Sequence, residues 1–160
     1  MEVLSEERET LPLKDAVKHL LEECRMVLPG IQALFGFQLI VVFNPGFDEK
    51  LSRPDQYLHL VAIALVAIAV VLVMSPAAWH RQLGPREVSA GFLRISTRLL
   101  LASMFPLAFG ICLDFFLIAA IITDDGLVPA LMATLLLVCF IAFWFVFPRL
   151  KRLRNTLGRA

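Results

Sequence analysis

One carboxylate stands inside a long apolar stretch of this sequence. Asp114 lies in the run from Leu99 to Ile122, about eight residues before the end of that run. If the run is a membrane-crossing helix, Asp114 lies roughly 12 Å below the surface at 1.5 Å per residue. An ionisable side chain at that depth costs roughly 2.5–3.5 kcal/mol and usually faces a bundle interior or water. Two interpretations stay open: a hydrogen-bonded carboxyl that holds helices together, and a cation or proton site.

Two other polar side chains are predicted at a similar depth. Gln38 lies about five residues before the end of the apolar run Met26–Phe43, and His59 opens the run Leu58–Ala78. Depth alone therefore allows a candidate ion or proton site made of Gln38, His59 and Asp114. The direction in which each side chain points does not follow from the sequence. For His59, the alternative is a side chain that reaches up to the membrane surface.

A second group of polar residues is expected at the other membrane boundary. We expect a ring of ion pairs there, in which Glu22 or Glu23 faces Arg94 or Arg98. Arg94 and Arg98 are one helical turn apart and share a face. The ring would set the register of the helices, and the alternative is a gate or a lipid headgroup site. Its members are Glu22, Glu23, Arg25, His80, Arg81, Arg94 and Arg98.

Small residues predict two places of close helix contact. Ala102, Pro106 and Gly110 precede Asp114 at four-residue spacing, which suggests a small-residue stripe that lets helices approach. A second set offers a contact face for a homo-oligomer, most simply a dimer: Ala62, Ala64, Ala67 and Ala69.

Four long apolar runs must position these residues. Each is about long enough to cross a hydrocarbon core of roughly 30 Å as a helix. Of the 15 Lys and Arg residues, 13 lie on one side of the predicted spans and only Lys50 and Arg53 lie on the other. Short loops rich in Lys and Arg stay in the cytoplasm, so both termini are predicted to be cytoplasmic. The runs are Met26–Phe43, Leu58–Ala78, Leu99–Ile122 and Leu127–Phe147.

The predicted fold is all-α, a polytopic membrane protein with four transmembrane helices in an antiparallel bundle. Residues 1–25 form a cytoplasmic arm, 26–147 the transmembrane domain, and 148–160 a basic cytoplasmic tail. The arm is expected to hold an amphipathic helix with Pro12 in its first turn. That helix lies on the membrane surface or packs on the inner mouth of the bundle. A turn-rich external loop is expected from Asn44 to Gln56.

Several function classes are disfavoured by the composition and the motifs. The hydrophobic fraction is 59%, above the roughly 45–50% usual for soluble globular proteins. We expect no enzymatic activity, because no nucleophile elbow, metalloprotease motif or phosphate-binding glycine loop is present. No metal site or cofactor is expected, and Cys24, Cys112 and Cys139 are interpreted as packing residues. The basic residues favour anionic membrane lipids over nucleic acid as partners.

Two stretches of the sequence resemble a known family. They are Leu20–Gln38, which contains Glu22-Glu23-Cys24-Arg25 and Gly36-Phe37-Gln38, and Pro76–Arg81, which reads Pro-Ala-Ala-Trp-His-Arg. Together they resemble a bacterial family of small four-span membrane proteins of unknown function, some of whose members carry a sodium:proton antiporter label. The resemblance implies the four-span topology and supplies no mechanism.

Two functional hypotheses follow from the sequence. The first is a structural or accessory protein of the bacterial inner membrane, whose basic cytoplasmic rim contacts lipid. The second is a small cation or proton transport protein that uses Asp114 as its titrating group.

Overall fold

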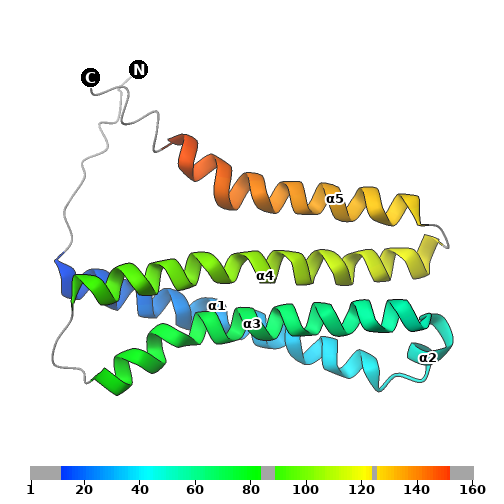
Figure 1. Ribbon diagram of the computed structural model, residues 1–160, viewed down its shortest axis with the longest axis horizontal. Coiled ribbons are helices and arrows are strands. Elements are labelled where there is room, and N and C mark those ends of the chain that lie inside the picture. The colour runs from blue at the N-terminus through cyan, green and yellow to red at the C-terminus, as the bar shows by residue number, and fades with distance from the viewer. Residues whose placement is uncertain (1–11, 84–88, 124–125, 152–160) are drawn as a thin grey trace.

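The computed structural model describes residues 12–83, 89–123 and 126–151 (Figure 1). Within these ranges the chain is helical and has no strand. The elements are α1 (Leu13–Val42), α2 (Gly46–Lys50), α3 (Arg53–Leu83), α4 (Ala90–Thr123), α5 (Leu127–Ile141) and a π-helical turn, η1 (Ala142–Val146), that continues α5. The predicted all-α fold with four long apolar helices in a bundle is confirmed.

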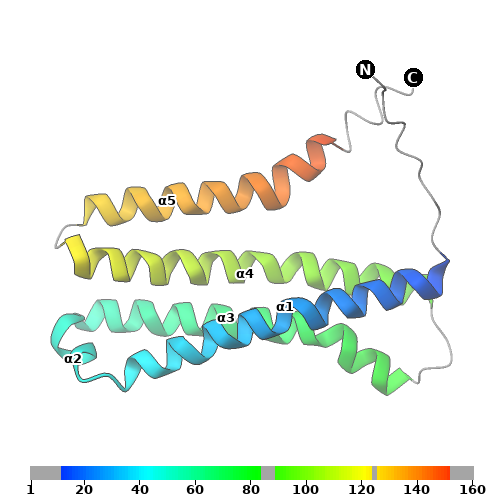
Figure 2. The same ribbon diagram turned by 180° about the vertical axis from the view of Figure 1, so that it is seen from behind.

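Consecutive long helices run in opposite directions, and α4 lies between α3 and α5 (Figures 1 and 2). α4 contacts each of the other three long helices, while α1 packs chiefly on α3. One end of the bundle, here the cationic end, holds the start of α1, the end of α3, the start of α4 and the end of the last helix. Its described cations are Lys14, Lys18, Arg25, Arg81, Arg94, Arg98, Arg149 and Lys151. Arg8, Arg86, Arg152, Arg154 and Arg159 lie outside the described residues, as do parts of the predicted arm and tail.

The outer surface of the bundle is apolar. Ile40, Val71, Ile118 and Leu135, one from each long helix, are each more than half exposed. Soluble monomers rarely expose large hydrophobic side chains on all of their helices in this way. Four stretches are long and apolar enough to cross a membrane: Leu13–Val42, Arg53–Gln82, Ala90–Thr123 and Leu127–Lys151. The chain therefore has the architecture of a membrane protein with four spanning helices.

The predicted arm and the first span form one continuous helix. α1 passes through Pro29 without a break, and its buried residues follow a three-, four- and seven-residue spacing: Val17, Leu20, Cys24, Ile31 and Gln38. Leu20, Cys24 and Ile31 pack with Val66 and Val73 of α3. Two placements were expected for the amphipathic helix of the arm, on the membrane surface or on the bundle. In the structure, the start of α1 packs on the bundle. Pro12 precedes the first turn of α1 instead of lying in it.

The external segment that was predicted to be a turn-rich loop contains helical structure. α2 occupies its centre and α3 already begins at Arg53. Two side chains support these starts: Asn44 Oδ1 accepts a hydrogen bond from the Gly46 N–H at 3.0 Å, and Ser52 Oγ donates to Asp55 Oδ2 at 2.5 Å. A serine followed three residues later by an acidic residue is typical of a helix start. Asp124 and Asp125 of the other loop on this side lie outside the described residues.

The small-residue stripe on α4 differs from the predicted one. Ala102 is exposed and Pro106 only half-buried, whereas Ser96, Ser103 and Gly110 are buried at seven-residue spacing. Four residues advance a helix by more than one turn, so a four-residue repeat drifts around the helix, while a seven-residue repeat stays nearly on one face. Only Gly110 of the predicted stripe is therefore buried, and it lies against Val66 and Ala62 of α3.

The predicted alanine face on α3 is divided between two sides of the helix. Ala62 and Ala69 are fully buried inside the chain, whereas Ala64 is exposed and Ala67 half-buried. The prediction that all four form one oligomer contact face is wrong, because Ala62 and Ala69 share the inward stripe of Val66 and Val73.

Candidate functional site

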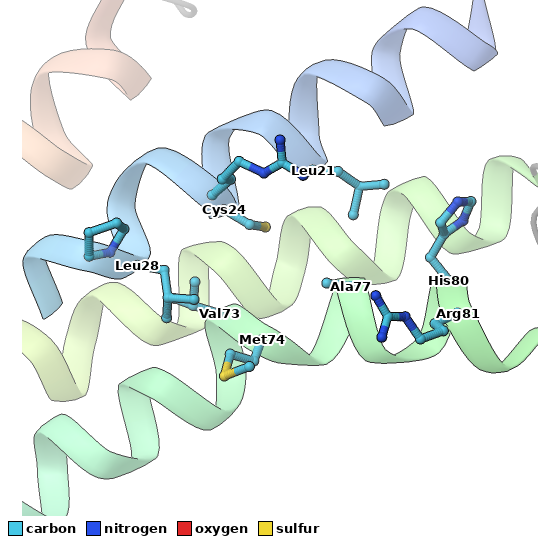
Figure 3. A pocket seen from close by; sticks show the side chains of 10 residues that line it. Leu21, Cys24, Leu28, Val73, Met74, Ala77, His80 and Arg81 are labelled. Carbon is cyan, nitrogen blue, oxygen red and sulfur yellow. The ribbon is translucent and has the colours of Figure 1, made fainter. Parts of the chain in front are cut away.

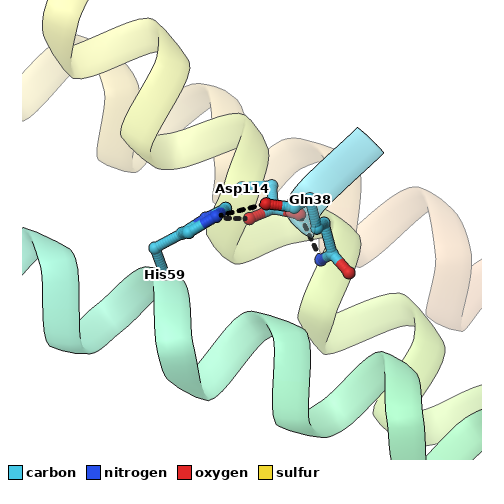
Figure 4. Close-up of polar contacts among 3 residues, drawn as sticks. All are labelled: Gln38, His59 and Asp114. Carbon is cyan, nitrogen blue, oxygen red and sulfur yellow. Dashed lines mark hydrogen bonds and ion pairs between the residues drawn. The ribbon is translucent and has the colours of Figure 1, made fainter. Parts of the chain in front are cut away.

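Three helices bring polar side chains together in the half of the bundle away from the cationic end. Gln38 comes from α1, His59 from α3 and Asp114 from α4, and each lies within three turns of the helix end on that side. Because the three helices run in alternating directions, residues far apart in sequence reach the same depth. The structure also shows the direction of the three side chains, which point toward one another (Figure 4). We call Gln38, His59 and Asp114 the polar cluster.

Asp114 joins the other two members through both of its carboxyl oxygens. Gln38 Nε2 donates to Asp114 Oδ2 at 2.5 Å, and His59 Nδ1 lies 3.1 Å from Asp114 Oδ1. His59 Nε2 lies 3.1 Å from the backbone carbonyl oxygen of Gln38, so the imidazole bridges α1 and α4 (Figure 4). Each pair of neighbouring helices among α1, α3 and α4 is thus linked by a polar contact.

These contacts suggest which atoms of the His59 ring donate and which accept. The Gln38 carbonyl oxygen can only accept, so His59 Nε2 must carry a hydrogen. Nδ1 then either donates to a carboxylate or accepts from a protonated carboxyl group of Asp114. In both cases a hydrogen bond joins Nδ1 and Oδ1. A buried polar group that has a hydrogen-bond partner is penalised least by an apolar environment.

The cluster is secluded from the surroundings. Gln38 is 3% exposed, and the side chains of His59 and Asp114 are 7% and 14% exposed. Phe47 of α2 packs on the His59 ring with 5.6 Å between ring centroids. A small cavity of about 170 Å³ touches all three members, and its remaining walls are apolar: Leu34, Phe37, Val41, Leu51, Leu117, Ile118 and Ile121. Gln38 Oε1 is buried without a hydrogen-bond partner. The arrangement can hold helices together and can bind or release one proton.

Gly110 sets the distance at which the cluster forms. A methyl group at this position would lie 2.9 Å from Val66 Cγ2 and 3.2 Å from the Ala62 carbonyl oxygen, so α3 and α4 touch almost backbone to backbone. Asp114 is one turn beyond Gly110, and His59 is one turn before Ala62. The close approach therefore brings the imidazole within hydrogen-bond distance of the carboxyl group.

The expected ion-pair ring at the cationic end is not formed. Glu22 pairs within its own helix, with Lys18 at 3.9 Å and His19 at 3.6 Å. Neither Glu22 nor Glu23 forms an ion pair with Arg94 or Arg98 in the part of the chain that the structure describes, so the favoured pairing is wrong. α1 packs chiefly on α3, and the side chains of Glu22 and Glu23 are exposed instead of being held in a contact between helices.

Other members of that predicted ring do come together. Arg25 of α1 and His80 and Arg81 of α3 line one cleft at the cationic end. The sequence placed these residues at one depth, but it did not indicate that they share a cleft without the acidic residues. The sequence analysis also missed Phe47 and the Gln38 backbone carbonyl as contacts of His59. Phe47 lies in a turn-rich segment, so the sequence gave no reason to expect it at His59. A contact to a backbone carbonyl group leaves no mark in the residue types at all.

Metal ligands and thiols add no further site among the described residues. No group of three or more His, Cys, Asp or Glu side chains there is arranged to hold a metal ion. Cys24 and Cys112 are buried and Cys139 is exposed, all three as free thiols.

Comparison with known proteins gives one match. A family model described as "Family of unknown function (DUF6328)" matches residues 6–148. A search of curated proteins and a search of solved structures each found no match to the chain.

Proposed function

This chain belongs to the DUF6328 family of unknown function, and from its geometry we propose an accessory, non-enzymatic protein of the bacterial inner membrane that holds anionic lipid at its cationic end. Both termini face the cytoplasm in this proposal, because short loops rich in Lys and Arg stay on that side. The protein acts as a homo-oligomer, most simply a dimer. α5 belongs to the least buried of the four spans, since only Pro129 of α5 is buried, and its apolar surface is available for that contact.

One observation carries the lipid proposal. Arg25, Arg81, Arg94 and Arg98 have no ion-pair or hydrogen-bond partner among the described residues. Four guanidinium groups at one membrane boundary attract anionic headgroups, each by about 1 kcal/mol near the surface. The apolar core between this end and the polar cluster contains Leu20, Cys24, Ile31, Val66 and Val73. This apolar core favours a packing role for the cluster over a polar path through the bundle.

Tryptophan fluorescence tests the proposal directly. Trp79 lies near the end of α3 and is 43% exposed. In a Trp144→Phe background, we expect brominated phosphatidylglycerol to quench Trp79 about twofold more than brominated phosphatidylcholine at equal mole fraction. The difference should shrink as salt screens the arginines. Equal quenching by the two lipids at low salt would contradict the proposal.

A cation or proton transport protein is the second candidate. The observation that favours it is the buried, unpartnered Gln38 Oε1 beside the contact of two ionisable side chains, His59 and Asp114. We expect Asp114→Asn to remain folded, because an amide can keep both contacts, and to abolish any flux that the parent shows in reconstituted vesicles. Vesicles with imposed sodium, potassium and proton gradients provide the measurement. Absence of flux in the parent protein under all three gradients would end this candidate.

A further inference from the structure

A cleft opens between α1 and α3 at the cationic end of the bundle. Its volume is about 640 Å³, within the roughly 300–1,000 Å³ range of small-molecule sites. Side chains from both helices border the same space (Figure 3). Those used below are Arg25 and Leu28 of α1 and Val73, Met74, His80 and Arg81 of α3.

The mouth of this cleft carries uncompensated positive charge. Arg25 and Arg81 contribute guanidinium groups, and no acidic side chain of the described ranges lines the cleft. Neither arginine has an ion-pair or hydrogen-bond partner among the described residues, and the nearby Glu22 is paired with Lys18 and His19 instead. The His80 ring packs on Phe92 of α4 with 5.8 Å between centroids, which holds it beside Arg81. Two guanidinium groups across a cleft suit a phosphate, which accepts paired N–H donors.

The inner part of the cleft is apolar. Met74 lies seven residues before Arg81, about 10 Å deeper along α3 at the standard helical rise. Leu28 and Val73 lie at the same inner end, on the two helices. Met74 is 46% exposed, so this part of the cleft is open toward the lipid-facing surface. Charge at the mouth and an open apolar wall below it match an amphiphile, whereas a water-soluble anion would leave the wall unused.

We propose that this cleft is a specific site for one anionic phospholipid. Its phosphate binds between Arg25 and Arg81, with His80 beside it, and an acyl chain lies along Leu28, Val73 and Met74. This inference rests on the proposed lipid-holding function and sharpens it, because it assigns one lipid to one cleft where the general proposal requires only a cationic surface.

Native mass spectrometry of the whole protein in mild detergent tests the site. We titrate with phosphatidylglycerol and with phosphatidylcholine and compare three forms: the parent, Arg25→Gln/Arg81→Gln, and the matched control Arg94→Gln/Arg98→Gln. The control removes the same charge from exposed arginines of α4 at the same end. We expect the parent to keep one phosphatidylglycerol. In the cleft variant its affinity should fall about tenfold or more, which is about 1.4 kcal/mol. The control should keep this first phosphatidylglycerol and lose only further, weakly held phosphatidylglycerol molecules, because Arg94 and Arg98 belong to the cationic surface and do not line the cleft.

Three outcomes would overturn the inference. Equal loss of affinity in both double variants would mean a diffuse charged surface, and the broader lipid proposal would stand. Displacement of the bound lipid by millimolar inorganic phosphate would mean that the cleft selects a soluble anion. Loss of the oligomer in the cleft variant, with lipid retention unchanged, would mean that a second copy of the chain occupies the cleft.

A variant with lysine at both Arg25 and Arg81 refines the test. Its affinity for phosphatidylglycerol should lie between those of the parent and the Gln variant, because lysine keeps the charge without the paired donors.

Discussion

Replacing Gly110 with alanine is expected to lower the free energy of unfolding by about 1–3 kcal/mol, the usual cost of forcing extra volume into a packed contact. The added methyl group would meet Val66 Cγ2 at 2.9 Å and the Ala62 carbonyl oxygen at 3.2 Å, and the backbone oxygen cannot turn away. α3 and α4 must therefore move apart, which draws His59 away from Asp114. Unfolding measured in mild detergent gives the energy.

The chain offers a matched control for this substitution. Gly36 lies in α1, and a methyl group added there has no atom within 4 Å. Gly36→Ala should leave stability unchanged or raise it by up to about 1 kcal/mol, since alanine favours a helix over glycine. The double variant Val66→Ala/Gly110→Ala should cost less than the sum of its two single variants, because Val66→Ala removes the nearest obstructing atom. Equal effects of Gly110→Ala and Gly36→Ala would show that the helices do not approach this closely.

Replacing Asp114 with leucine should destabilise the bundle more than replacing it with asparagine. Leucine fills a similar space but leaves Gln38 Nε2 and His59 Nδ1 without partners in a buried setting. Each of the two stranded polar groups costs about 1–3 kcal/mol, so we expect a loss of about 2–6 kcal/mol. Asparagine can accept from Gln38 and donate to a neutral His59, so its loss should stay below about 1 kcal/mol. Unfolding measured under the same conditions compares the two variants.

A double-mutant cycle isolates the His59–Asp114 contact. His59→Leu/Asp114→Leu removes both partners, so its cost should be smaller than the sum of the two single leucine variants by about 1 kcal/mol or more. Strict additivity would mean that the two side chains do not interact in the folded protein. An Asp114→Leu variant as stable as the parent would rule out the packing role of the cluster.

The depth of a residue along the bundle could be predicted from the sequence, because it follows from the number of residues between it and the end of its apolar run. Helical rise and the ends of the apolar runs place Gln38, His59 and Asp114 at one level, and the structure shows them in contact. The same counting placed Arg25, His80 and Arg81 at one boundary. The four-helix architecture was predictable for a related reason, since lipid requires each spanning segment to satisfy its own backbone hydrogen bonds.

The direction in which a side chain points depends on how the helices pack against one another. A single sequence does not contain that information. The predicted Glu22 or Glu23 pairing with Arg94 or Arg98 was wrong: α1 packs chiefly on α3, and Glu22 finds its partners, Lys18 and His19, on its own helix.

The sequence by itself determined that four helices cross a membrane, that the cations gather at one end, and which polar residues share a depth. Hydropathy, charge and helical rise are properties of each segment, and they need no knowledge of its neighbours. Only the tertiary structure decided that Gly110 brings α3 against α4, that His59 bridges Gln38 and Asp114, and that Arg25 and Arg81 face one cleft. Rotation of each helix about its axis is set by contacts between helices, because surrounding lipid favours no particular apolar face.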